Sequence, residues 1–304
     1  MREYYDKDEK KMTKEEVQEL PPEELGPRSG IPVKVLPDYG SLYEAVAEMM
    51  AQFIQQQKGK KVTMILPVGP TQQYPIFVKK VNERGISLKN LWTFNMDEFL
   101  DRNGKTIPES HPMSFRGDMM RNFFNLIRPE LRMPIEQMHF PRHDNLEEID
   151  KAFDRHAPDG VDLCLAGVGP EGHIAFNEDP NFNHVEVSEK EFLADRTRLV
   201  LVKTSTVDMD ALVAGCGDRA AIPPFAVTIG PHDILRAKRT EVVFFAGRWH
   251  RTPVRETLFR KPTMHFPGSL LKIRKNREGF LEKQDITIWT TPVEAGTIFS
   301  KTMS

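Results

Sequence analysis

A histidine flanked by two glutamates lies in the glycine-rich stretch "LAGVGPEGHIAFNED". His173 titrates near neutral pH, which suits proton transfer, and a neighbouring carboxylate can fix the tautomer of its ring and raise its basicity. Glu171 and Glu178 are the candidates for that carboxylate. No serine or cysteine stands beside them, so the pattern has the base and orienting acid of a triad without its nucleophile. The alternative is a turn that carries an exposed histidine and solvated acids.

Gly169 and Gly172, in the same stretch, permit tight turning and close approach of the backbone to a ligand, so we expect both to contact substrate. The letters "GVGPEG" also fit the dinucleotide fingerprint G-x-G-x-x-G. That fingerprint needs a helix at once and an acid about 20 residues on, whereas this chain continues as the loop "HIAFNEDPNFN". The pattern therefore argues against a nicotinamide cofactor.

Two acids, Asp97 and Glu98, follow the apolar run "LWTFNM". Neighbouring acids at the end of a strand repel each other, and simple burial would cost desolvation. Asp97 is therefore a candidate general base, with a solvated loop acid as the alternative. Glu98 is expected to point the other way or to hold backbone donors, and it is counted among the substrate-binding candidates.

Two more stretches could bind an anion. "PVGPTQQY" leads into a predicted helix whose first N–H groups favour negative charge, with Gly69 and Thr71 as the expected contacts. The indication is weak, because a proline removes one donor and the Walker lysine is absent. "AGRWHRTPVR" brings Arg248 and His250, which could hold a phosphate or carboxylate or could lie on a solvated helix face.

Strand and helix patterns alternate from residue 31 onwards. Apolar runs at 61–69, 91–96 and 161–169 predict buried strands, with helical spacing between them. Later strand-like runs lie at 196–202, 225–230, 241–247 and 285–290. This order predicts an α/β fold, a modified doubly wound (Rossmann-like) mostly parallel sheet with helices on both faces, in one domain over residues 31–304. Ligands of such sheets bind beyond the carboxyl ends of the strands, where these loops fall.

Residues 1–30 form a charged N-terminal arm. Thr13 and Glu16 match a helix capping box, and two prolines follow at once. We expect this arm to be disordered alone or packed on a neighbouring subunit.

Composition limits the partners. The net charge is −2, with 39% hydrophobic and 28% charged residues, which gives no bulk attraction to nucleic acid or to an anionic membrane. No apolar run approaches the roughly 20 residues that cross a bilayer, and the charged N-terminus does not match a secretory signal. Two cysteines cannot build a disulfide framework or a cysteine metal site. We expect a soluble, cytoplasmic protein.

Several stretches together carry a family pattern. "TFNMDEF" followed by "HPMSFRGDMMRNFF", and then "GVGPEGHIAFNE", resemble the glucosamine-6-phosphate deaminase/isomerase family. "FAVTIGPHDILRAKRTEVVFFAG" is similar to a later part of that family, so the resemblance covers residues 40–260 or so. It implies a modified doubly wound α/β domain and conversion of an amino-sugar 6-phosphate to a ketose phosphate with release of ammonia. It also implies that no metal or organic cofactor is used.

The resemblance assigns roles by position. Asp97 matches the acid that moves a proton between C2 and C1 of the sugar. His173 matches the residue that opens the sugar ring, and Glu178 matches its carboxylate partner. Glu171 stands where the family usually has Asp beside the same histidine, and its longer side chain could still reach the ring.

The phosphate contacts depart from the family. Only Thr71 of its phosphate loop is retained, the phosphate-binding Arg falls near Leu212 where no basic residue stands, and the phosphate-binding Lys falls at His250. Because a charge-assisted hydrogen bond is worth roughly 1.5–3 kcal/mol, these losses would weaken phosphate binding. Either Arg248 and His250 rebuild the site, or the substrate has shifted.

Two other functions stay open. Sugar-phosphate lactonases share the fold and a loop like "GPEGH", and a non-catalytic sugar-phosphate sensor would bind without turnover. The intact Asp97, His173 and Glu178 argue against the sensor, which needs no proton relay. In each case the expected ligand is a small sugar or sugar phosphate, and we expect a homo-oligomer.

Overall fold

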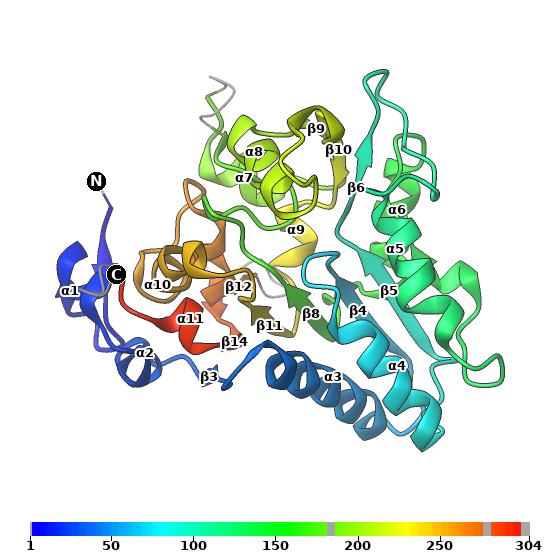
Figure 1. The fold of residues 1–304 in the computed structure, drawn as a ribbon, viewed down its shortest axis with the longest axis horizontal. Helices are drawn as coiled ribbons and strands as arrows, with labels where there is room; N and C mark the ends of the chain where they lie inside the picture. Colours follow the sequence, from blue (N-terminus) through cyan, green and yellow to red (C-terminus); the bar gives the residue numbers. More distant parts are fainter. Residues whose placement is uncertain (1, 181–185, 276–280, 299–304) are drawn as a thin grey trace.

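The computed structural model describes residues 2–180, 186–275 and 281–298, and its centre is a seven-stranded sheet (Figure 1). The strand order is β3-β14-β11-β8-β4-β5-β7, and every neighbouring pair is parallel. The strands are β3 Val33–Val35, β4 Val62–Leu66, β5 Leu91–Asn95, β7 Met138–His139, β8 Leu163–Ala166, β11 Arg239–Val243 and β14 Asp285–Thr290. The predicted doubly wound parallel sheet is confirmed.

Helices cover both faces of this sheet, because its central strands β4 and β8 are buried at every position. Successive side chains point to opposite faces, so Leu163 and Leu165 of β8 enter one hydrophobic cluster and Cys164 and Ala166 enter another. Helices α3, α4 and α5 cover the first face, and α6, α9 and α10 cover the second. Their bounds are α3 Tyr39–Gln56, α4 Gln73–Arg84, α5 Phe115–Asn122, α6 Leu146–His156, α9 Pro231–Ile234 and α10 Arg251–Phe259.

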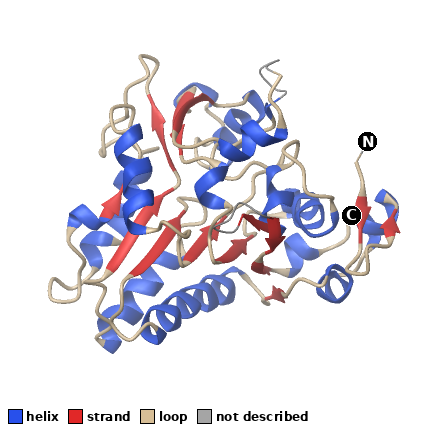
Figure 2. Cartoon of the chain, turned by 180° about the vertical axis from the view of Figure 1, so that it is seen from behind, coloured by secondary structure: helices blue, strands red, loops and turns tan. Residues whose placement is uncertain are grey.

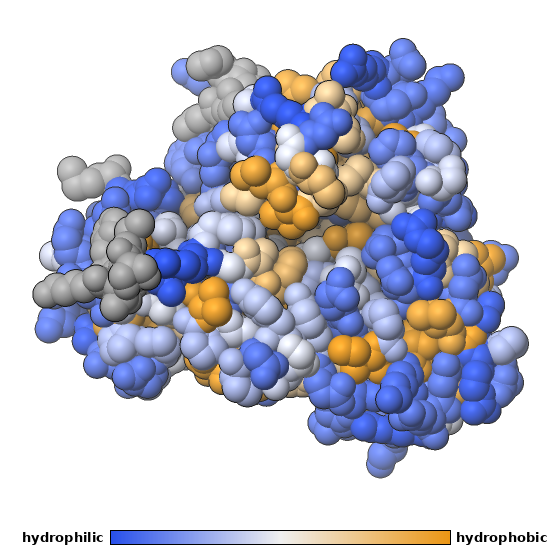
Figure 3. Space-filling view, in the orientation of Figure 1, coloured by the Kyte–Doolittle hydropathy of each residue, from blue (hydrophilic) through white to orange (hydrophobic). Residues whose placement is uncertain are grey.

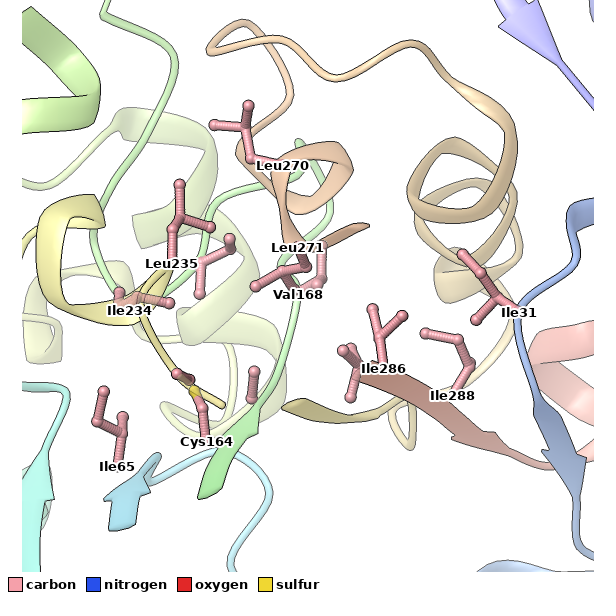
Figure 4. Close-up of a cluster of buried hydrophobic side chains, with 14 of the residues drawn as sticks. Ile31, Ile65, Cys164, Val168, Ile234, Leu235, Leu270, Leu271, Ile286 and Ile288 are labelled. Atoms are coloured by element: carbon pink, nitrogen blue, oxygen red, sulfur yellow. The ribbon is translucent and has the colours of Figure 1, made fainter. Parts of the chain in front are cut away.

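The second cluster reaches the loop that follows β8. Figure 4 shows Val168 beside Leu271, above Cys164 and near the isoleucines of β14. Val168 is 3% exposed, so the first turn of the histidine-bearing loop is anchored in the core. Such anchoring limits the freedom of the residues that follow it.

A second, three-stranded antiparallel sheet forms a lobe at the top of Figure 1. It contains β6 Asp97–Leu100, β10 Phe225–Thr228 and β9 Arg198–Leu201, in that order, and it carries α7 Glu189–Ala194 and α8 Thr204–Val213. The runs predicted at 196–202 and 225–230 are therefore strands, but they lie outside the parallel sheet. Because β6 begins two residues after β5 ends, its antiparallel pairing with β10 turns the chain away from the main sheet.

The N-terminal arm is folded onto its own chain, so the expectation that it is disordered or packed on another subunit is wrong. It forms β1 Tyr4–Tyr5, β2 Lys11–Met12, α1 Lys14–Glu19 and α2 Pro22–Ser29, with the predicted capping box of Thr13 and Glu16 at the start of α1. Its buried apolar residues belong to the same cluster as α10; they are Tyr4, Met12, Val17, Leu20 and Leu25. Figure 2 shows both chain ends on this side of the molecule.

The shorter elements complete the chain. They are η1 Phe124–Leu126, η2 Ile135–Gln137, η4 Arg219–Ala221, η5 Arg248–His250, η6 Pro267–Lys272, β12 Ile273–Lys275, β13 Leu281–Lys283 and α11 Pro292–Ala295. Among the residues described, the helices include none with the length and apolar character that a membrane span requires.

We expect Arg255→Met to destabilise the protein by about 2–3 kcal/mol, because it leaves buried carbonyl groups without a donor. The Arg255 guanidinium is 1% exposed and donates to the carbonyl oxygens of Val17 (2.9 Å), Leu20 (2.6 Å) and Ala295 (3.0 Å). Denaturant unfolding measures the change, with Arg102→Met at an exposed position as the matched control. Equal stabilities of the two variants would contradict this role for Arg255.

Candidate functional site

Four of the loops selected from the sequence meet at one edge of the sheet. Strands β11, β8, β4 and β5 are neighbours in that order, and all end at the same edge because they are parallel. The chain runs outward in both directions from β4 and β8, which makes the crevice between them the topological switch point, the usual place for a ligand. A side-chain carbon at Gly167 would lie 2.5 Å from the carbonyl oxygen of Gly69, so the two central loops touch there.

Hydrophobic residues gather towards the middle of the face in Figure 3, below the lobe of the second sheet, while its rim is mainly hydrophilic. In Figure 1, which has the same orientation, the loops after β4 and β8 lie in that middle region. An exposed apolar patch with a polar rim is typical of a surface that binds a ligand or a partner.

Asp97 is the first residue of β6 and lies at this edge. Its side chain is almost buried, at 8% exposure, and no hydrogen bond from any described residue reaches its carboxylate. Burial raises the pKa of Asp97 well above its ordinary value, and the nearby charges of Glu98 and Asp210 raise it further. A carboxyl with a raised pKa and a free lone pair suits a general base that works near neutral pH.

Glu98 turns to the other side of β6 and caps helix α5. Its carboxylate accepts hydrogen bonds from the Ser114 hydroxyl (3.0 Å) and from the N–H groups of Phe115 (3.0 Å) and Arg116 (2.9 Å). The expectation that Glu98 holds backbone donors is confirmed. Because these donors occupy both carboxylate oxygens inside the protein, the structure contradicts its assignment to substrate.

The His173 ring is held against the backbone of Gly169. A side-chain carbon at Gly169 would lie 2.1 Å from Nε2 of the ring, and the Gly169 N–H donates to the His173 carbonyl at 3.0 Å. Gly172, with φ +89°, faces Phe266. Both glycines therefore make room for protein side chains, and their contact with substrate stays a prediction. Burial lowers the pKa of His173 to about 4, so its ring is neutral at pH 7.

Neither glutamate hydrogen-bonds the His173 ring directly. Glu178 accepts from the Thr206 hydroxyl at 2.5 Å and from the Lys203 N–H at 2.9 Å, and the Thr206 oxygen lies 3.5 Å from His173 Nδ1. Burial raises the pKa of Glu178 to about 7. Glu171 instead forms an ion pair with the Lys203 ammonium. The expected direct contact between Glu178 and His173 is thus replaced by a contact through Thr206.

One hydrogen bond joins the histidine segment to the strand opposite Asp97. Thr228 of β10 lies across from Asp97 in register, and its hydroxyl accepts from the Phe176 N–H at 3.2 Å. Phe176 is three residues after His173. Thr228 therefore contacts both the strand that carries Asp97 and the segment that carries His173.

The basic loop after β11 supplies fewer ligand groups than the sequence predicts. His250 is 1% exposed; its Nδ1 accepts from the Ala246 N–H at 3.0 Å, and its Nε2 lies 3.1 Å from the Val168 carbonyl oxygen. Burial lowers the pKa of His250 to about 3. This buried, neutral ring has no nitrogen left for substrate, so the structure contradicts that assignment. Arg248 is exposed at the start of η5, without a hydrogen bond or ion pair to the described residues.

Two residues of α8 belong to the site but do not stand out in the sequence. Thr206 and Asp210 are four residues apart on this helix and therefore share a face. Thr206 contacts Glu178, and Asp210 has a pKa raised to about 6 by burial. Their four-residue spacing, which is typical of one helix face, is the sequence signal that could have identified them. It becomes useful only when α8 is known to follow the strand beside the site.

We expect Asp210→Asn to lower the pKa of Asp97, because it removes a nearby negative charge. Asp210 is charged only above its own pKa of about 6. The change in the pKa of Asp97 should therefore be seen where Asp97 titrates above that pH. A carbon-13 NMR titration of the Asp97 carboxyl measures it directly. Asp208→Asn is the matched control, since Asp208 is exposed on the same helix and paired with Arg219. An unchanged pKa of Asp97 would show that the two carboxylates do not interact.

The fold is similar to that of solved sugar-phosphate enzymes. A monomeric glucosamine-6-phosphate deaminase has a similar structure, with a TM-score of 0.70 at 22% identity, over 88% of this chain and 100% of that one. The 6-phosphogluconolactonase of Thermotoga maritima also matches, with a TM-score of 0.57 at 15% identity, over 86% and 98%. These likenesses show the shared fold.

Within residues 2–180, 186–275 and 281–298, no group of three or more His, Cys, Asp or Glu side chains is placed to hold a metal.

Sequence relatives narrow the class. The chain is 30% identical over 209 residues to the glucosamine-6-phosphate deaminase of Fusobacterium nucleatum, covering 68% of this chain and 69% of that enzyme. It is 29% identical over 210 residues to that of Caenorhabditis elegans, covering 66% and 72%. It is 27% identical over 249 residues to that of Clostridioides difficile, covering 80% and 91%. No family model matches the chain. The chain belongs to the glucosamine-6-phosphate deaminase family.

Proposed function

We propose that the protein converts an amino-sugar phosphate such as glucosamine 6-phosphate to a ketose phosphate with release of ammonia. The observation that supports this most is the pair of proton-transfer groups at the carboxyl edge of the sheet. Asp97, after β5, has a buried carboxylate with no hydrogen-bond partner among the described residues, and His173 has a neutral ring on the loop after β8. A sugar that must open and then shift a proton needs two such groups.

His173 serves the first step, ring opening. The proton of the anomeric hydroxyl passes to Nε2 of the neutral imidazole as the bond between C1 and the ring oxygen breaks. The ring oxygen then receives a proton from Nε2, which leaves an aldehyde at C1. A ring with a pKa of about 4 stays unprotonated at neutral pH and can accept this proton.

Asp97 serves the second step. Its carboxylate removes the proton from C2, which the aldehyde has made acidic, and returns it to C1. The carbonyl oxygen at C1 takes up the proton that the amino group gives up, so C1 becomes a hydroxymethyl group and C2 an imine. Water then hydrolyses the imine to the ketose phosphate and ammonia. The burial of Asp97 and its raised pKa both favour this transfer.

Phosphate recognition falls mainly to Arg248 in this proposal. Of the basic side chains predicted there, His250 is buried and neutral, and Arg248 remains exposed without a protein partner among the described residues. Gly69 and Thr71 lie on the adjacent loop after β4, where a side-chain carbon at Gly69 would be 3.9 Å from Phe245 of the loop after β11. Backbone N–H groups of that loop would complete a smaller phosphate site.

Ammonia release from purified protein tests the proposal. Glucosamine 6-phosphate is compared with unphosphorylated glucosamine, and Arg248→Met is compared with Arg102→Met. We expect turnover of the phosphate, with KM raised about 10-fold or more by Arg248→Met alone, since a charge-assisted hydrogen bond is worth roughly 1.5–3 kcal/mol. Release of ammonia from neither sugar would contradict deamination. Hydrolysis of 6-phosphogluconolactone would then support the lactonase alternative, and ligand-induced thermal stabilisation without turnover would support the sensor.

A further inference from the structure

The hydroxyl of Thr206 lies between the His173 ring and the Glu178 carboxylate. Its oxygen is 2.5 Å from Glu178 Oε1 and 3.5 Å from His173 Nδ1, and no other described residue hydrogen-bonds the ring. A hydroxyl has one proton and two lone pairs. If that proton goes to the carboxylate, the oxygen can only accept from the ring, which places a proton on Nδ1 and a lone pair on Nε2.

The surroundings hold these three groups in place. Thr206 is 3% exposed, so water does not readily replace its hydroxyl. Glu178 is held from its other oxygen by the Lys203 N–H at 2.9 Å, and the ring is held against Gly169. Thr206 lies in the first turn of α8, so the helix backbone positions its hydroxyl.

We infer that Thr206 is a positioning residue that couples the tautomer of His173 to Glu178, through the chain Glu178 Oε1, Thr206 Oγ1, His173 Nδ1. The inference rests on the proposed function, because the tautomer matters for ring opening. It adds a residue to the relay and changes the role of Glu178. The carboxylate acts on the ring through a hydroxyl.

The chain lets the ring exchange protons without becoming a buried cation. When Nε2 takes the proton of the anomeric hydroxyl, Nδ1 passes its proton to Thr206 Oγ1, and Thr206 passes its own to Glu178 Oε1. When Nε2 protonates the ring oxygen, the three protons return. One proton has then moved from the anomeric oxygen to the ring oxygen, and the protein is unchanged. The pKa of Glu178, raised to about 7, suits a carboxylate that is protonated transiently.

Other charges near the ring come from three elements. Glu171 on the same loop and Lys203 at the start of α8 are paired with each other, so their effects on the pKa of His173 are opposed. His250 of η5 is close enough to interact with His173 electrostatically, but its ring is neutral. Among the described residues, the one hydrogen-bonding contact of Nδ1 is the uncharged hydroxyl of Thr206.

The test compares Thr206→Val, which removes the hydroxyl at constant shape, with Thr206→Ser, which keeps it. Thr204→Val, at an exposed position on the same helix, is the control. We expect Thr206→Val to lower kcat for glucosamine 6-phosphate about 10²-fold with little change in KM, which is the lower end of what general acid–base assistance contributes. Thr206→Ser and Thr204→Val should stay within a few-fold of wild type. Equal losses in Thr206→Val and Thr206→Ser, or no loss in either, would overturn the inference.

Nitrogen-15 NMR of the histidine rings tests the same inference without turnover. In the wild type, His173 should show a protonated Nδ1 and an unprotonated Nε2, and Thr206→Val should shift the ring towards the other tautomer. Assignment uses His173→Gln, and thermal unfolding checks that each variant is folded. If the wild type shows a protonated Nε2, the inference is wrong even when ammonia is released. If ammonia release fails but the tautomer depends on Thr206, only the proposed function is wrong.

Discussion

Asp97→Asn should lower the rate of ammonia release by at least about 10³-fold and, at the same time, make the protein more stable. The loss of activity follows because an amide cannot accept the C2 proton, and general acid–base steps contribute about 10² to 10⁴-fold. The gain in stability follows because the Asp97 side chain is 8% exposed and receives no hydrogen bond from the described residues. A neutral side chain of the same shape removes the cost of burying that charge.

The gain should depend on pH. Because the pKa of Asp97 is raised in the folded state, the folded protein holds this proton more tightly than the unfolded chain does. The group's contribution to stability is therefore present below the unfolded pKa of about 3.9 and is lost as the pH rises through the folded pKa. Asp97→Asn does not lose stability in this way as the pH rises. Its free energy of unfolding should therefore exceed that of the wild type by an amount that grows from pH 5 to pH 8 and reaches about 1–2 kcal/mol.

Denaturant unfolding at the two pH values measures this difference, with Asp208→Asn as the control at an exposed, ion-paired carboxylate. The control should show almost no change, because a surface ion pair contributes about 0–1 kcal/mol. A destabilised Asp97→Asn variant would mean that the carboxylate supports the fold. An active variant would exclude Asp97 as the base for proton transfer.

Much of the site can be read from the sequence because strand order limits where the loops can go. Short apolar runs identified β4, β5, β8 and β11, and parallel strands place their following loops along one edge. Asp97 and His173 lie there as predicted, after β5 and β8, with β4 between these two strands. The predicted homo-oligomer stays a prediction.

The errors have a common physical cause, which is burial of groups that are usually exposed. His250 looks like a phosphate ligand in the sequence, yet both of its nitrogens face backbone groups and its ring is neutral. Arg255 lies in the same basic stretch of the sequence, and it donates to carbonyl groups of the N-terminal arm. Sequence patterns do not report which long-range contacts will surround a polar side chain.

Thr206 and Asp210 escaped prediction for a different reason. Both residues lie on α8, which comes after His173 in the chain and is separated from it by a loop and a strand. Their residue types do not mark them as functional. Only the packing of α8 beside the loop after β8 brings Thr206 to Glu178. That packing also makes the contact between Glu178 and the His173 ring indirect, through Thr206. The sequence predicts that Glu178 and His173 are partners, but it does not show whether they touch directly.

His173→Gln should abolish most activity towards ring-closed substrate and spare activity towards substrate that is already open. Glutamine has no nitrogen that can accept and return a proton, so kcat for glucosamine 6-phosphate should fall about 10² to 10⁴-fold. The 4,5-dideoxy analogue has no hydroxyl able to close a ring and exists as the aldehyde. With that analogue, the ratio of variant to wild-type kcat should stay within about 10-fold, because Asp97 performs the remaining transfer.

The two catalytic assignments are separated by comparing this variant with Asp97→Asn. Asp97→Asn should lose activity towards both substrates, because both must move the C2 proton. Equal losses of His173→Gln on the closed and open substrates would show that His173 acts in the proton transfer itself, and the ring-opening assignment would be wrong. Since the ring is already neutral above its pKa of about 4, the kcat of the wild type on the closed substrate should show no titration of His173 between pH 6 and 8. A loss of activity in that range would instead be traced to Asp97 or to Glu178, whose pKa is about 7.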